Sequence, residues 1–132
     1  MAKTLIQVRD TLIAKLVEIW QDRTTILYEN ANEWDLDDSS TVLRVEVQFG
    51  SGEQFEMAED PDQRQYGNLY FEIWQRPGEG TKSLLEFAQV LVDGFKFLDL
   101  DGVKTQAVQF MDAPKIAGLR GQALYVAFDT VV

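Results

Sequence analysis

Apolar residues recur at helical spacing in two segments of the chain. The first segment is Lys3–Trp20, and one of its faces carries Leu5, Val8, Leu12, Ile13, Leu16, Val17 and Trp20. The second is Lys82–Phe95, whose apolar stripe is Leu84, Leu85, Ala88, Leu91, Val92 and Phe95. Thr81 or Ser83 is its predicted N-cap, because a hydroxyl can accept a hydrogen bond from the first turn. The pattern predicts two amphipathic helices that pack against a core.

Alternation of apolar and polar residues predicts strands elsewhere. The predicted strands are a short one at Thr25–Tyr28 and four longer ones at Thr41–Phe49, Tyr66–Arg76, Thr105–Met111 and Gln122–Thr130. The segments between them, which are rich in glycine, proline and acidic residues, are predicted to be loops and turns. We therefore expect one α+β domain over residues 1–132, with a mainly antiparallel sheet of about four to five strands and two helices packed on one face.

One face of the strand Tyr66–Arg76 is unusually aromatic. Leu69, Phe71 and Ile73 alternate with Tyr70, Glu72 and Trp74, so both faces carry large side chains. An exposed Tyr70–Trp74 pair would form a sticky surface patch. The pattern leaves two explanations open, burial within the monomer or contact with another subunit. The second makes Tyr70 and Trp74 candidate contact residues, and it predicts that Trp74→Ala folds normally but assembles poorly.

The segment Gly50–Gln65 shows no core periodicity and is predicted to be a long connection. Such loops in compact domains are commonly functional. The segment contains one basic residue, Arg64, and five acidic residues: Glu53, Glu56, Glu59, Asp60 and Asp62. We treat these six residues as a candidate functional loop.

The composition narrows the chemistry that the chain can perform. Cysteine and histidine are both absent, which excludes disulfides, thiolate nucleophiles, histidine bases and zinc sites built from either residue. The net charge is -10, so phosphate backbones are repelled. We expect no enzymatic activity, no cofactor and no metal site. A weak carboxylate site for magnesium or calcium stays open, although neither the acidic segment Glu29–Ser40 nor Asp99–Gly102 has EF-hand spacing. No apolar stretch approaches a membrane span, and we expect a soluble intracellular protein.

A longer motif resembles a known family. The strand Asn68–Trp74 is followed by Arg76-Pro77-Gly78-Glu79-Gly80 and then by a helix that contains Leu84–Leu91 and ends at Phe95. This strand, turn and helix resemble the phage tail terminator-like proteins, and the other predicted elements follow in the same order.

The resemblance implies a structural role in a phage or prophage tail. Such proteins form a ring, commonly a hexamer, that caps the tail tube, ends tube growth and presents the surface to which the head attaches. The implied partners are further copies of the chain, the tail tube protein and a head-completion protein, with no membrane involved. The implied location is the virion tail, after assembly in the bacterial cytoplasm. DNA would pass through the ring without specific binding. From its charge, we hypothesise that the acidic loop Gly50–Gln65 lines the channel or faces the tube.

Three other functions remain open at this point. The chain could be a different head–tail connector or minor tail protein. It could be a monomeric module that binds a small ligand in a pocket lined by Trp20, Trp34 or Trp74. It could also be an enzyme that works through carboxylates alone. The assembly state separates the ring from the monomeric module.

Overall fold

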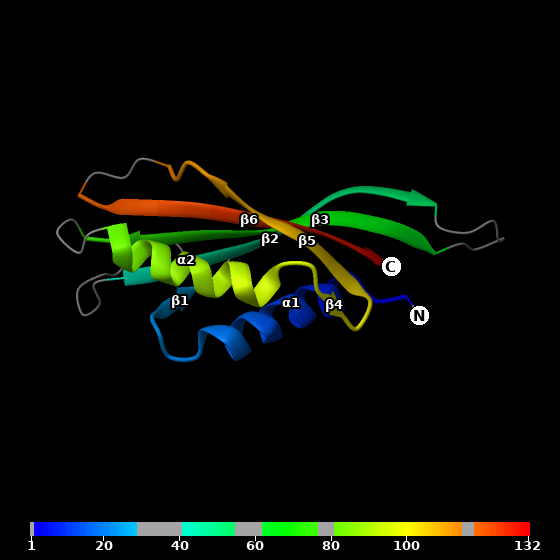
Figure 1. Cartoon of the computed structure of the whole chain (residues 1–132). Coiled ribbons are helices and arrows are strands. Elements are labelled where there is room, and N and C mark those ends of the chain that lie inside the picture. Colours follow the sequence, from blue (N-terminus) through cyan, green and yellow to red (C-terminus); the bar gives the residue numbers. More distant parts are fainter. Residues whose placement is uncertain (1, 29–40, 55–61, 77–80, 115–117) are drawn as a thin grey trace.

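The computed structural model describes residues 2–28, 41–54, 62–76, 81–114 and 118–132. Two helices and six strands follow one another in this part of the chain (Figure 1). The helices are α1 (Leu5–Trp20) and α2 (Thr81–Phe95). The strands are β1 (Thr25–Leu27), β2 (Thr41–Gln54), β3 (Gln63–Gln75), β4 (Asp99–Leu100), β5 (Val103–Met111) and β6 (Arg120–Val131).

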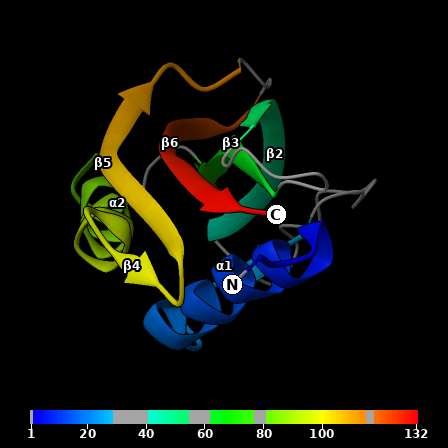
Figure 2. The ribbon, with the colours of Figure 1, turned by 90° about the vertical axis from the view of Figure 1, so that its right-hand side faces the viewer.

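The strands form one mixed sheet in the order β1-β2-β3-β6-β5-β4. The pair β1 and β2 is parallel, and the other neighbouring pairs are antiparallel. The sheet curls into a half-barrel, as the end-on view in Figure 2 shows. The prediction of a mainly antiparallel sheet of four to five strands is therefore wrong. It missed the two-residue strand β4, which was assigned to a turn, and it could not foresee the parallel pairing of β1.

Both helices lie on the same face of this sheet (Figures 1 and 2). A capping box starts α1: Thr4 Oγ1 accepts from the Gln7 amide and Gln7 Oε1 accepts from the Thr4 amide. The buried stripes of the two helices meet the inner side chains of β2, β3 and β6 in one core. Its helical members are Val8, Leu12, Leu16, Trp20, Leu84, Ala88, Leu91 and Phe95. Burial of each large aliphatic or phenylalanine side chain in this core is worth about 1.5–3 kcal/mol, which makes the core the main source of stability.

Regular structure extends further into Gly50–Gln65 than the sequence indicates. β2 continues to Gln54 and β3 begins at Gln63, so the prediction of an irregular connection is wrong at both ends. A β-bulge between Phe49 and Gly52 shifts the register and breaks the alternation of side chains. The amide of Gln65, which is 5% exposed, holds this bulge by donating to the carbonyls of Gly50 and Tyr66 at 2.9 Å each. Figure 1 shows the paired ends of β2 and β3 extending past both helices.

Candidate functional site

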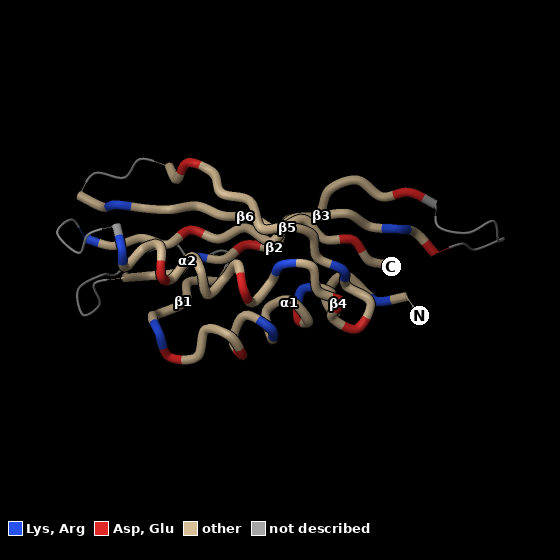
Figure 3. Tube along the Cα trace, in the orientation of Figure 1, with Lys and Arg blue, Asp and Glu red and all other residues tan. Residues whose placement is uncertain are grey.

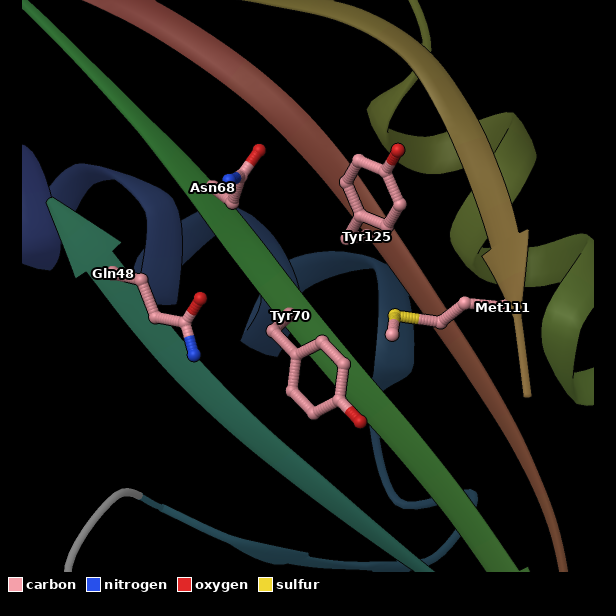
Figure 4. A pocket seen from close by; sticks show the side chains of 5 residues that line it. All are labelled: Gln48, Asn68, Tyr70, Met111 and Tyr125. Atoms are coloured by element: carbon pink, nitrogen blue, oxygen red, sulfur yellow. The ribbon is translucent and has the colours of Figure 1, made fainter. Parts of the chain in front are cut away.

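The face of the sheet opposite to the helices, here called the open face, carries the candidate site. Even-numbered residues of β2 and β3 occupy it, since side chains alternate along a strand. Cross-strand pairing brings Gln48 beside Asn68 and Tyr70 beside Tyr125. Figure 4 shows these side chains, together with Met111 of β5, on the near side of the strands with the helices behind.

These five side chains line a shallow hollow of about 540 Å³: Gln48, Asn68, Tyr70, Met111 and Tyr125. The lining combines two amides, two phenols and one thioether, and it contains no charged group. Amides and phenols both donate and accept hydrogen bonds, and the rings and the thioether offer apolar contact area. Met111 is 42% exposed. The hollow is thus chemically suited to a polar and aromatic contact.

An ion pair with a buried carboxylate lies next to the hollow on the same face. Glu72 is 2% exposed, and its Oε2 accepts from Nη1 of Arg44 at 2.9 Å. Its other oxygen, Oε1, accepts from Nε1 of Trp74 at 2.9 Å. Nη2 of Arg44 also lies 4.0 Å from Glu46. Both oxygens of the buried carboxylate are therefore satisfied, which offsets the cost of removing it from water.

Tyr70 lies between the hollow and this ion pair. Burial, followed by the nearby negative charge of Glu72, raises the pKa of Tyr70 to about 12. The phenol is thus held in its neutral form, in which it can donate a hydrogen bond.

We expect this pKa to appear as a late transition in a phenolate absorbance titration. A tyrosine with a folded-state pKa above its unfolded value of about 10 stabilises the fold fully below pH 10, and this contribution is lost as the pH rises toward 12. Tyr66 donates a hydrogen bond to Glu53, which raises the pKa of Tyr66 as well. The titration is therefore best done in a Tyr66→Phe background. Tyr70→Phe should remove the late transition, and Tyr125→Phe should keep it. A late transition that survives in Tyr70→Phe would contradict the assignment.

The two aromatic residues proposed for subunit contact have different environments in the structure. Trp74 is 1% exposed, with its indole against Gly121 of β6, so it is buried within the monomer. Tyr70 is partly exposed at the edge of the hollow. Of the two residues, only Tyr70 is kept as a candidate contact residue.

The structure describes three of the six residues of the candidate acidic loop. Glu53 is exposed and accepts from the Tyr66 hydroxyl at 2.7 Å. Arg64 pairs with Asp129 of β6 at 3.4 Å, and Asp62 is partly exposed just before β3. The remaining predicted residues, Glu56, Glu59 and Asp60, lie outside the described residues.

Four residues of the hollow were not foreseen from the sequence: Gln48, Asn68, Met111 and Tyr125. Gln48 and Met111 are 63 positions apart in the chain and come together only through the pairing of β2, β3, β6 and β5. Each lies on a predicted strand, but the strand order and register that join them are not encoded in local alternation.

Charged groups do not gather into a further site in the described part of the chain. No cluster of three or more carboxylates that could hold a metal ion occurs among these residues. The predicted acidic segment Glu29–Ser40, with Trp34, lies outside them. Figure 3 shows lysine and arginine dispersed over helices and strands. Neither α1 nor α2 is long and apolar enough to span a membrane.

Comparison with known proteins gives information on the fold alone. No protein-family model matches the chain, and no curated protein matches it. Among solved structures, 13 chains match. One of them, named only by a sequence identifier, superposes with a TM-score of 0.63 at 14% sequence identity, over 92% of this chain and 94% of that chain. Likeness at this identity shows that the two chains share a fold, and a fold does not by itself define a function.

Proposed function

We propose that this protein is a structural phage or prophage tail protein of the tail terminator type. In this role, copies of the chain form a ring that caps the tail tube, ends tube growth and presents the surface to which the head attaches. The support from sequence is the strand, the Pro-Gly-Glu-Gly turn and the helix between Asn68 and Phe95, together with the order of the other elements.

The observation that carries the proposal is the open face. Helices cover one face of the sheet, whereas the other displays the hollow of Tyr70, Tyr125 and Met111 with the amides of Gln48 and Asn68. Aromatic residues and methionine are enriched at protein interfaces, and charged residues are depleted from their centres. A surface of this composition fits a protein that works by contact with other protein chains.

The projecting ends of β2 and β3 supply the second element of the proposed role. We assign this end of the molecule, with Glu53, Asp62 and Arg64, to the channel or to the tail tube. Its acidic character would keep the phosphate backbone of passing DNA from binding. The proposed partners are other copies of the chain, the tail tube protein and a head-completion protein, with no cofactor. A head–tail connector or another minor tail protein would share these features and differ in its place in the particle.

Assembly state is the first test. We expect light scattering over a wide concentration range to show a closed oligomer, and negative-stain images to show rings with a central hole. Added to polymerising tail tube protein, the rings should limit tube length. Rings that leave tube length unchanged would exclude the terminator role and favour a connector.

The hollow also favours a second candidate, a monomeric module that binds a small ligand. A volume of about 540 Å³ falls within the range of small-molecule pockets. This site differs from the pocket expected from the sequence, since Trp20 is 0% and Trp74 is 1% exposed. A chain that is monomeric at all concentrations, with a melting temperature raised by a ligand, would establish this candidate in place of the ring.

A further inference from the structure

The half-barrel has two strand edges that the described part of the chain leaves partly unpaired. On one side, β1 pairs with β2 at positions 42–44 and no further. On the other side, β4 pairs with β5 at Val103 and Lys104, and the backbone of Phe97 and Leu98 bonds to the next two residues of β5. Beyond these contacts, β2 from Val45 pairs only with β3 and β5 from Ala107 pairs only with β6 among the described residues, so the outer side of each strand has no strand partner there. In the described part of the chain no strand covers these outer sides, so their backbone groups offer an edge to which another chain can pair.

The directions of these strands suit pairing between copies of the same chain. The strands β2, β3, β6 and β5 are successive antiparallel neighbours, so β2 and β5 run in opposite directions. Figure 4 shows their arrowheads pointing opposite ways. A rotation about an axis parallel to the strands leaves every strand direction unchanged. A second copy generated by such a rotation can therefore place its β2 beside β5 of the first copy, with the two strands antiparallel. This is a head-to-tail contact, which closes into a ring when the rotation is a simple fraction of a turn.

The side chains on both edges also favour a partner. Phe49 of β2 is 38% exposed, whereas Phe110 and Met111 of β5 are 53% and 42% exposed. Natural edge strands are commonly protected by lysine, proline or inward-pointing charge. None of these occurs in Ala107–Met111. The bulge after Phe49 ends the regular part of the β2 edge, so the regular stretches, Val45–Phe49 and Val108–Met111, are similar in length.

We propose that β2 of one copy pairs antiparallel with β5 of the next copy, and that repetition of this contact closes the ring. The inference rests on the proposed function and specifies its interface. Alternation then requires side chains of the same face to meet: Gln48 and Gln109 lie on the open face, whereas Phe49 and Phe110 lie on the helix side. Within this constraint, the proposed register places Gln48 opposite Gln109.

Cysteine cross-linking tests this arrangement directly, because the chain contains no cysteine of its own. We expect an oxidised mixture of Gln48→Cys and Gln109→Cys chains to form mixed dimers, and the double variant to form higher oligomers. The matched control pairs Gln109→Cys with Phe49→Cys, whose side chain is on the opposite face and should not cross-link. Equal cross-linking in both mixtures, or none in the first, would overturn the proposed pairing.

A charge at the edge provides the second test. Phe110→Lys should abolish the oligomer, because lysine on an edge strand opposes pairing. Leu85→Lys on α2 is the control, since Leu85 is 55% exposed and Phe110 is 53% exposed, and it should assemble like the wild type. Equal assembly of both variants would overturn the inference.

The two proposals fail in different ways. Rings in which Gln48→Cys and Gln109→Cys do not cross-link would refute the strand pairing and leave the ring intact. Specific cross-links in open chains that never limit tail tube length would refute the terminator role and leave the strand pairing intact. A chain that stays monomeric at the highest concentration would overturn the strand pairing.

Discussion

Replacement of Trp74 with alanine is expected to lower the free energy of unfolding by about 3–5 kcal/mol, the usual range for a buried tryptophan. The indole is 1% exposed, and it lies so close to β6 that a Cβ on Gly121 would be 2.5 Å from the ring. Its Nε1 donates to Oε1 of Glu72, a carboxylate that is itself 2% exposed. The substitution therefore opens a cavity and removes a hydrogen bond from a buried charge. Such a loss is a large share of the roughly 5–15 kcal/mol that stabilises a typical domain.

Urea denaturation of the isolated chain measures this effect. Trp74→Phe is the informative control, because it keeps an aromatic ring but removes the donor to Glu72, and its loss should fall between those of wild type and alanine. Tyr70→Ala, at a partly exposed position, should cost less than Trp74→Ala. An unfolding free energy for Trp74→Ala within about 1 kcal/mol of wild type would contradict the assignment of Trp74 to the monomer interior.

This prediction differs from the one that follows from the sequence alone, and the reason is physical. Alternation places Tyr70 and Trp74 on the same face of β3, and it carries no information on which neighbours cover each residue. The structure pairs Trp74 with Gly121, whose missing side chain makes room for the indole, and pairs Tyr70 with Tyr125 at the hollow. Two residues of one pattern thus have different environments because their partners on β6 differ in size.

The parts of the fold that depend on local signals were predicted well. The helical stripe ending at Trp20 and the stripe ending at Phe95 both correspond to helices with these ends. Features that depend on distant pairing were not predicted. They are the parallel partner of β2, the register shift after Phe49 and the short strand β4, which is defined by its bonds to β5.

The candidate site follows the same division. Tyr70 could be selected from its own strand, because Tyr70 and Trp74 give β3 large side chains on both faces, which is a local anomaly. Gln48 and Met111 look like ordinary strand residues, and the hollow between them exists only because β3 and β6 separate β2 from β5 in the sheet.

The packing of the helix-side core around Gly67 is tight enough to be tested by adding a single methyl group, as in Gly67→Ala. It lies opposite Phe49 on β2 and Phe128 on β6. A Cβ at this position would lie 2.5 Å from the backbone oxygen of Gln48 and 2.5 Å from Cζ of Phe128. The Phe128 ring cannot easily withdraw, because it is 2% exposed and meets Phe49 edge to face, with ring centroids 6.0 Å apart.

Gly67→Ala is therefore expected to destabilise the chain by about 1–3 kcal/mol, the usual cost of overpacking. Gly50→Ala, in the same pair of strands, is the matched control, since its Cβ would meet Tyr66 O at an ordinary 3.6 Å. Urea denaturation of both variants provides the comparison, and equal stability would mean that Phe128 does not pack over Gly67. The Phe128 ring meets Phe49 edge to face, so a shift of Phe128 would be passed on to Phe49 on the β2 edge. Gly67→Ala should therefore also weaken assembly. Gly50→Ala, beyond the regular part of that edge, should leave assembly unchanged. A Gly67→Ala chain that is destabilised yet assembles normally would place the subunit contact away from Phe49.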